Sequence, residues 1–237
     1  MDNAAASGAQ ITAVMNPDSG PGTQAESSYT LAISSLESAG GNVIGYVPTE
    51  YTDNSISTVE SEIDTYESFY PKIGGFFLDE MTDASNSADI SYYQTLYNYI
   101  KGQNSSYIVV ANPGTSVPSS YANLADTLVT FEGPDSSYPG NTAISWRSGQ
   151  PASKFANIVY ETANTTSMFA GLSQAQSQNV GYVYFTDDGA DGNPYNDLPS
   201  YFSTAVDAVV PEPAGVALCL GALALRMRPT RAGRRAR

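Results

Sequence analysis

The feature that most constrains the fold is an alternation of short apolar runs with longer helix-like stretches between residues 11 and 209. Gly, Pro, Asn or Asp bound the apolar runs, which is typical of strands. Strands that alternate with helices form a parallel sheet, so the sequence predicts an α/β fold. We expect strands at residues 11–17, 42–49, 73–80, 107–114, 128–134, 157–162 and 180–187. We expect helices at residues 25–39, 56–70, 90–102, 168–178 and 201–209.

Seven strands are one fewer than an eight-stranded (β/α)8 barrel of the TIM type needs. Because the first expected strand begins at residue 11, we interpret the fold as a TIM-type barrel that lacks its first βα unit in this chain. Residues 1–10 are then a disordered N-terminus, and residues 11–208 form one barrel domain. The alternative is an open doubly wound sheet. The Gly-rich segment 16–22 fits neither the dinucleotide-binding nor the P-loop spacing that such sheets commonly carry.

The composition excludes several kinds of catalysis. The chain has no histidine, and its one cysteine, Cys219, lies outside the expected barrel, which excludes His-containing triads, His-ligated zinc and thiolate metal clusters. We therefore expect no metal and no cofactor. The net charge is −14, and residues 1–225 hold all 24 acidic residues but only 4 of the 10 basic ones. Such a body should repel nucleic acid and tolerate neutral or cationic substrates.

Carboxylates follow two of the apolar runs directly. The run GGFFLDE ends in Asp79 and Glu80, and the run LVTFEG carries Glu132. Active sites of barrels lie at the C-terminal ends of the strands, which makes these three residues the candidate catalytic groups. Side-chain alternation puts Asp79 on the face of Phe77, and Glu132 on the face of Thr130. We expect both faces to line the barrel mouth, with Glu80 at the rim as a supporting group.

Other polar and aromatic side chains at the strand ends are predicted to bind substrate. The tyrosines among them either stack on sugar rings or pack in the core. The two asparagines either bind sugar hydroxyls or cap the turns before the prolines that follow them. Asp187 opens the loop after the last strand, which we expect to face the substrate. The residues predicted to bind substrate are Asn16, Tyr46, Thr49, Tyr51, Asn112, Tyr184 and Asp187.

Two carboxylates at a barrel mouth are the minimum apparatus for glycoside hydrolysis. One acts as nucleophile or base, and the other, with a raised pKa, protonates the leaving oxygen. Acidic side chains also stand at solvated strand ends for purely structural reasons. The residues taken alone leave both interpretations open.

Five motifs, in order along the chain, resemble the spherulin-4-like glycoside hydrolase family, which is related to the endo-α-1,4-polygalactosaminidases. They are NPDSGPG at 16–22, GYVPTEY at 45–51, GGFFLDE at 74–80, ANPG at 111–114 and TFEG at 130–133. The resemblance covers roughly residues 11–190. This chain departs from the family in one motif, because Leu78 precedes Asp79 where the family has phenylalanine.

The resemblance implies a (β/α)8 barrel and an endo-acting hydrolase that cleaves α-1,4-linked galactosamine or N-acetylgalactosamine polysaccharide with retention. It implies Asp79 as nucleophile or electrostatic stabiliser, Glu132 as general acid and base, and Glu80 as an assisting group. A rival hypothesis stays open at this point. According to this hypothesis, the chain is a non-catalytic carbohydrate-binding or extracellular matrix protein with the same barrel fold.

The C-terminal segment 209–237 differs in composition from the barrel. After Pro211-Glu212-Pro213 comes an uncharged apolar run at 214–225, which is shorter than a full membrane span, and then an arginine-rich end. This layout resembles the bacterial PEP-CTERM sorting signal.

That resemblance implies export to the cell envelope or extracellular matrix, with transient membrane anchoring by residues 214–225 and processing by an exosortase-type enzyme. A role in biofilm polysaccharide remodelling is a further expectation from resemblance. Such tails accompany an N-terminal signal peptide, but residues 1–10 show neither a basic start nor an apolar run. We therefore expect that the natural start lies upstream of Met1.

Overall fold

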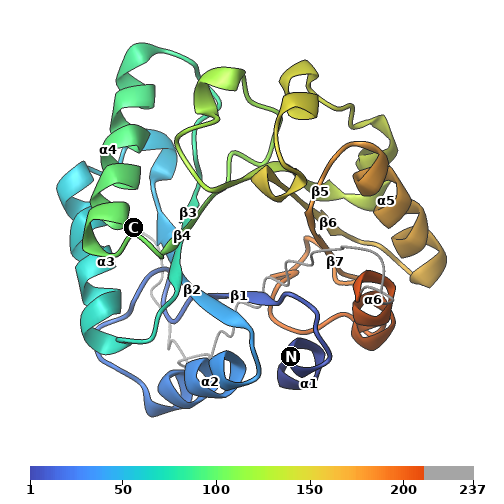
Figure 1. Cartoon of the computed structure of the whole chain (residues 1–237), viewed down its shortest axis with the longest axis horizontal. Coiled ribbons are helices and arrows are strands. Elements are labelled where there is room, and N and C mark those ends of the chain that lie inside the picture. The colour runs from blue at the N-terminus through green and yellow to red at the C-terminus, as the bar shows by residue number, and fades with distance from the viewer. Residues whose placement is uncertain (211–237) are drawn as a thin grey trace, which may run out of the picture.

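The computed structural model describes residues 1–210. Its centre is one sheet of seven parallel strands, whose spatial order β1 to β7 is also their order along the chain. Helices surround this sheet on the outside (Figure 1). The strands are β1 (Thr12–Met15), β2 (Asn42–Pro48), β3 (Gly75–Asp79), β4 (Ile108–Ala111), β5 (Thr127–Pro134), β6 (Phe155–Tyr160) and β7 (Tyr182–Phe185). The α-helices are α1 (Asp2–Ala6), α2 (Ser27–Ser38), α3 (Ile56–Phe69), α4 (Ser87–Gln103), α5 (Thr165–Ser177) and α6 (Phe202–Val209).

The topology confirms the predicted α/β fold with a parallel sheet. Every expected strand and helix is present, and the bounds differ by only a few residues. Consecutive strands are neighbours throughout, so the doubly wound alternative is wrong, because that fold requires the strand order to reverse. The sheet curves into a partial barrel whose edge strands, within residues 1–210, are β1 and β7. That a first βα unit is missing stays a prediction.

The structure differs from the expectation of a disordered N-terminus at residues 1–10. Residues Asp2–Ala6 form helix α1, which lies between α2 and α6 (Figure 1). The small side chains of Ala4 and Ala5 are buried in the same apolar cluster as residues of α2. The hydroxyl of Ser35 on α2 also donates to the Asp2 carboxylate over 2.5 Å. An alanine-rich helix packs closely without bulky side chains, and sequence periodicity misses so short a helix.

Both faces of the strands are buried, which explains their nearly continuous apolar sequences. Every strand contributes to one apolar cluster inside the barrel, while the opposite faces pack against the surrounding helices. The β3 residues show this division, because Phe77 belongs to the inner cluster and Phe76 and Leu78 belong to the outer one. The inner cluster consists of Val14, Ile44, Phe77, Val110, Val129, Ala156, Ile158 and Tyr184.

Side-chain caps fix where three of the long helices begin. Ser55 accepts from the backbone N–H of Thr58 at the start of α3, and Asn86 and Asn164 cap α4 and α5 in the same way. Each cap satisfies backbone donors that the helix itself leaves without partners. From β4 to β6 the connections contain only short 3-10 turns: η2 (Ser119–Tyr121), η3 (Asp135–Gly140), η4 (Ser145–Gly149) and η5 (Ala152–Lys154).

No helix within residues 1–210 combines the length and apolarity needed to cross a bilayer. The segment 214–225, predicted to enter a membrane, lies outside the described residues.

Gly75 lies at the start of β3, where the backbones of β3 and β4 approach each other closely. Substitution of this glycine tests that close approach. Its φ is +150°, and a Cβ atom there would lie 2.0 Å from the carbonyl oxygen of Ile108. We expect Gly75→Ala to lower the free energy of unfolding by about 1–3 kcal/mol or more, because the backbone of β4 must move. Chemical denaturation followed by circular dichroism measures the loss.

Gly102→Ala is the matched control for this prediction. Gly102 lies in the last turn of α4, and a Cβ atom there meets nothing within 4 Å. Alanine favours the helix by up to about 1 kcal/mol relative to glycine, so this variant should be neutral or slightly more stable. Equal stability of the two variants would contradict the close approach of β3 and β4.

Candidate active site

Two carboxylates face each other at the C-terminal end of the sheet and share one hydrogen-bond donor. The side-chain nitrogen of Asn112 donates to Asp79 Oδ1 over 2.7 Å and to Glu132 Oε2 over 2.5 Å. The combined length of these two bonds limits the separation of the two oxygens to about 5.2 Å. The structure thus brings together Asp79 and Glu132, as the strand-end argument predicts, from β3 and β5.

Asn112 follows β4, the strand between β3 and β5, and its orientation is fixed. Its side-chain oxygen accepts from the N–H of Gly114, and the carbonyl of Gly114 accepts from the N–H of Glu132. The amide therefore has a single orientation in which both N–H bonds point at the acids. Asn112 was predicted to contact substrate, but its two N–H groups are occupied by Asp79 and Glu132.

Strand β3 delivers Asp79 as the alternation predicts, with Phe77 in the inner cluster and Asp79 above it. The chain then turns sharply at Glu80, which adopts a left-handed φ of 53°. Thr49 holds this turn, because its hydroxyl lies 2.8 and 2.9 Å from the carbonyl oxygens of Asp79 and Glu80.

Strand β5 places Glu132 in the mouth by a different route from the one predicted. Val129, rather than Thr130, belongs to the inner cluster, so the prediction that Thr130 shares the inner face with Glu132 is wrong. A β-bulge shifts the register between Val129 and Phe131, so that Val129 pairs with Ala156 and Phe131 with Asn157. The extra residue at the bulge restores Glu132 to the inner side, where it pairs with Ile158.

The acids line a cavity of about 200 Å³. Its walls are aromatic and aliphatic, and its polar groups converge on the two carboxylates, which is the usual composition of a small-molecule site. The lining residues are Val14, Asn16, Tyr46, Phe77, Asp79, Asn112, Glu132, Ile158, Asn193 and Tyr195.

Tyr195 and Asn193 are functional candidates that sequence reasoning missed. Both lie in the loop after β7, at positions that no strand end marks. The hydroxyl of Tyr195 donates to Glu132 Oε1 over 2.5 Å, and its backbone N–H donates to Asn193 Oδ1 over 3.0 Å. Only the return of this loop over the barrel mouth, which is a tertiary feature, places Tyr195 beside Glu132.

The local environment raises the pKa of two groups that line the cavity, Glu132 and Tyr46. Burial raises the pKa of Glu132, hydrogen bonds from Tyr195 and Asn112 lower it in part, and the charge of Asp79 raises it again. Burial, followed by the charge of Asp79, also raises the pKa of Tyr46, which donates a hydrogen bond to Asp79. A carboxyl group with a raised pKa is suited to hold a proton and release it to a bound molecule.

Glu80 does not line the cavity with Asp79. It is half-buried, and burial, followed by the charges of Asp79 and Glu50, raises its pKa. That Glu80 supports the reaction from the rim stays a prediction.

The other predicted binding residues divide into two groups. Asn16 and Tyr46 line the cavity. Thr49 does not, and the prediction that it contacts substrate is wrong, because it is 0% exposed and its hydroxyl holds the turn at Glu80. Tyr51 is 62% exposed beside that turn, and its N–H donates to the carbonyl of Glu80.

The two predicted residues from the end of β7 do not line the cavity either. Tyr184 is buried in the inner cluster, and its ring packs against Tyr195 with the centroids 6.3 Å apart. The Asp187 carboxylate accepts from the N–H of Ser200 over 3.0 Å and also from the Ser200 hydroxyl. These two side chains support the loop that carries Tyr195 rather than line the cavity.

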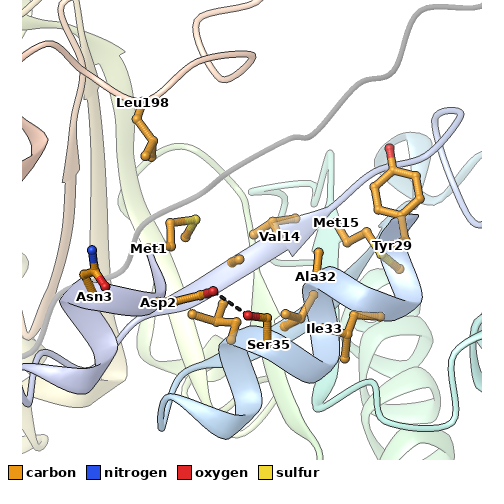
Figure 2. Close-up of a pocket in the computed structure, with 13 residues that line it drawn as sticks. Met1, Asp2, Asn3, Val14, Met15, Tyr29, Ala32, Ile33, Ser35 and Leu198 are labelled. Atoms are coloured by element: carbon orange, nitrogen blue, oxygen red, sulfur yellow. Dashed lines mark hydrogen bonds between the residues drawn. The ribbon is translucent and has the colours of Figure 1, made fainter. Parts of the chain in front are cut away.

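A larger and more apolar pocket of about 470 Å³ lies at the edge of the sheet, between α1, β1 and α2. Figure 2 shows its wall of Met1, Val14, Met15, Tyr29 and Ile33, with Leu198 on the opposite side. Its one carboxylate, Asp2, receives the Ser35 hydroxyl. Of these two cavities, the smaller one holds the paired acids. Within residues 1–210 no group of three or more acidic or thiol side chains is placed to hold a metal ion.

Comparison with known proteins gives consistent relationships. The sequence model of the family described as Spherulin4, spherulation-specific family 4, matches residues 2–209. Spherulin-4 of Physarum polycephalum is 35% identical over 216 residues, which are 87% of this chain and 64% of that protein. The chain thus spans less than two thirds of that relative.

Among solved structures, the chain resembles the crystal structure of Aspergillus clavatus Sph3 in complex with GalNAc. The TM-score is 0.75 at 23% identity, and the alignment covers 86% of this chain and 87% of that one. At this identity the likeness concerns the fold.

The Tyr195 hydroxyl provides a direct test of the site geometry. Its hydrogen bond stabilises the charged form of Glu132, so Tyr195→Phe should raise the pKa of Glu132 further. Carbon-detected NMR titration of glutamate carboxyls, with Glu132→Gln used for assignment, measures this pKa.

Tyr99→Phe is the control for this titration. Tyr99 donates to the exposed Asp64 over 2.5 Å on the outer helices, so its removal deletes the same kind of bond elsewhere. The pKa of Glu132 should not change in this variant. An unchanged or lowered pKa in Tyr195→Phe would show that the loop does not close over Glu132.

Proposed function

The chain belongs to the spherulation-specific family 4, and from this premise we propose that it is an exported glycoside hydrolase. Its substrate is a polysaccharide that contains α-1,4-linked galactosamine or N-acetylgalactosamine, cleaved internally and with retention of configuration. The observation that carries the proposal is the pair Asp79 and Glu132, held by one amide in a cavity with aromatic walls.

The separation of the two acids supports a retaining reaction. Retaining glycosidases hold their carboxyl groups about 5–5.5 Å apart, whereas inverting enzymes need about 6.5–9.5 Å to admit a water molecule. The two oxygens bonded to Asn112 lie within about 5.2 Å of each other, the combined length of the two bonds. This upper limit lies below the spacing that an inverting reaction needs, which supports retention.

In the proposed reaction Glu132 gives its proton to the glycosidic oxygen as the bond from that oxygen to the anomeric carbon breaks. Asp79 meets the positive charge at that carbon, as nucleophile in a glycosyl ester or as electrostatic stabiliser. Glu132, now charged, takes a proton from the incoming water, and the new C–O bond releases Asp79. The raised pKa of Glu132 supports this division of roles.

The neighbouring side chains supply binding and support. Tyr46 donates to Asp79 and stacks on Phe77 with the ring centroids 6.4 Å apart, so both form one wall of the cavity. Asn16 offers polar contacts on the β1 side. Tyr51, exposed at the rim, presents a ring on which a further sugar residue stacks. Glu80 assists from beside the cavity.

Two observations favour an amino-sugar substrate. The similar structure of Sph3 was determined with GalNAc, the N-acetylated form of that sugar. The acidic composition, with residues 1–225 holding all 24 acidic residues and only 4 of the 10 basic ones, suits the cationic charge of galactosamine that lacks its acetyl group.

Export is the second part of the proposal, and it rests on the sequence of residues 209–237. Fractionation of cells that contain an exosortase-type enzyme tests it. We expect the chain in the envelope or medium, with residues 214–225 removed from the mature form. Retention of the full-length chain in the cytosolic fraction would contradict export.

Removal of either acid should slow hydrolysis strongly. We expect Glu132→Gln and Asp79→Asn each to lower kcat/KM on galactosaminogalactan by about 10²–10⁴-fold, because general acid catalysis alone contributes that much. Release of reducing ends measures the rate. NMR of the fresh products should show the α-anomer first.

Glu37→Gln is the control for this measurement. Glu37 forms an exposed ion pair with Lys72 over 2.8 Å on the outside of the barrel, and such pairs contribute little. Its activity should match that of the unchanged protein. An unchanged rate in Glu132→Gln would refute the assignment. Binding of the polymer without any hydrolysis by the unchanged protein would instead favour the non-catalytic carbohydrate-binding alternative.

A further inference from the structure

Arg147 is an unusual cation, because its side chain is buried without a carboxylate partner among the described residues. It is 1% exposed and lies in η4, outside the barrel wall. The two ion pairs found within residues 1–210 involve Lys72 and Lys101. Burial of an unpaired charge is costly, so such a residue needs a reason to be there.

The strongest contact of Arg147 is with the bulged residue of β5. Its Nη2 atom donates to Thr130 Oγ1 over 2.7 Å, and its guanidinium lies over the ring of Phe155 at 4.9 Å from the centroid. Its Nη1 atom lies 3.3 and 3.4 Å from the side-chain and backbone oxygens of Gln178, and its Nε atom has no partner within residues 1–210. The best-made hydrogen bond of the guanidinium thus goes to Thr130.

Thr130 also forms a hydrogen bond to the neighbouring strand, β6. Its hydroxyl donates toward Asn157 Oδ1 on β6 over 3.1 Å, and Asn157 Nδ2 donates to the hydroxyl of Tyr138 over 2.9 Å. The ring of Tyr138 in turn packs against Phe131 with the centroids 4.9 Å apart. A chain of hydrogen bonds therefore holds Thr130, and ring packing against Tyr138 holds Phe131, the two residues that the bulge turns outward.

The bulge decides on which side of the sheet Glu132 lies. Strand side chains alternate with a period of two, so Val129 inside would put Glu132 outside if the strand were regular. The extra residue Thr130 reverses this parity, because Val129 and Glu132 pair with Ala156 and Ile158, which both face inward. Whatever stabilises Thr130 in the outward position also keeps Glu132 in the cavity.

We propose that Arg147 is a positioning residue for Glu132. Through Thr130 it locks the β5 bulge that turns this carboxylate toward Asp79 and Tyr195. Only the kinetic part of the following test depends on the proposed function. The NMR part does not.

The test measures whether Tyr195→Phe still changes the pKa of Glu132 when the Arg147 guanidinium is absent. In the Arg147→Met variant, the additional substitution Tyr195→Phe should no longer raise the pKa of Glu132. The Glu132 carboxylate would already have lost its hydrogen bond from the Tyr195 hydroxyl. In the kinetic part, kcat should fall at least tenfold, while KM changes less than twofold. Thr130→Val should act like Arg147→Met, and Thr130→Ser, which keeps the hydroxyl, should act like the unchanged protein.

Lys154→Met is the matched control. Lys154 is also a partly buried cation near β6, and it donates to the carbonyl oxygens of Ala122 and Ala125 but not to the bulge. This variant should lose stability and keep the effect of Tyr195→Phe on Glu132.

The proposal would be overturned if Arg147→Met lowered the melting temperature but left kcat unchanged, and if Tyr195→Phe still raised the pKa of Glu132 in that variant. Arg147 would then be a purely structural residue. If Arg147→Met does not fold, the comparison of Thr130→Val with Thr130→Ser decides in the same way. If the unchanged protein hydrolyses no glycan, the proposed function fails, and the NMR comparison still decides the role of Arg147.

Discussion

The site depends on one amide, that of Asn112, which keeps two carboxylates close together. When both are charged, two carboxylates within about 5.2 Å, the combined length of the two bonds to Asn112, repel each other, and burial strengthens the repulsion. The two N–H bonds of the amide offset this repulsion, and the N–H of Gly114 prevents the amide from turning. Because β4 lies between β3 and β5, its strand end is the place from which one side chain can reach both acids.

The sequence predicts most of the framework because its signals are local. Apolar runs that end in turn residues locate the strands, and the strand order follows from short right-handed connections. Asp79 is predictable for the same reason, since β3 is regular from Phe77 onward. Glu132 reaches the cavity, although the prediction that Thr130 shares its face is wrong. A single extra residue reverses the parity of a strand, and nothing in the run LVTFEG marks Thr130 as that residue.

Tertiary contacts decide the remaining site residues, and the sequence does not reveal them. Tyr195 becomes a site residue because its loop returns over the mouth, and Arg147 approaches β5 from a turn 17 residues along the chain from Thr130. Thr49 illustrates the opposite error. It stands at a strand end, as binding residues do, but its hydroxyl faces the backbone of Asp79 and Glu80. Position at a strand end therefore identifies the region of the site, and only packing distinguishes contact from support.

The backbone itself separates the functional end of the barrel from the stabilising end. Within residues 1–210, seven residues other than glycine have positive φ: Ser19, Glu50, Tyr51, Thr52, Glu80, Glu161 and Asn179. The first six follow the C-terminal ends of strands. Asn179 follows α5, where an asparagine is readily accommodated. Left-handed conformations cost on the order of 1 kcal/mol each, and they persist only where surrounding contacts enforce them. Thr49 enforces the one at Glu80, so part of the stability of the barrel is used to hold the mouth in the shape that sets Asp79 beside Glu132.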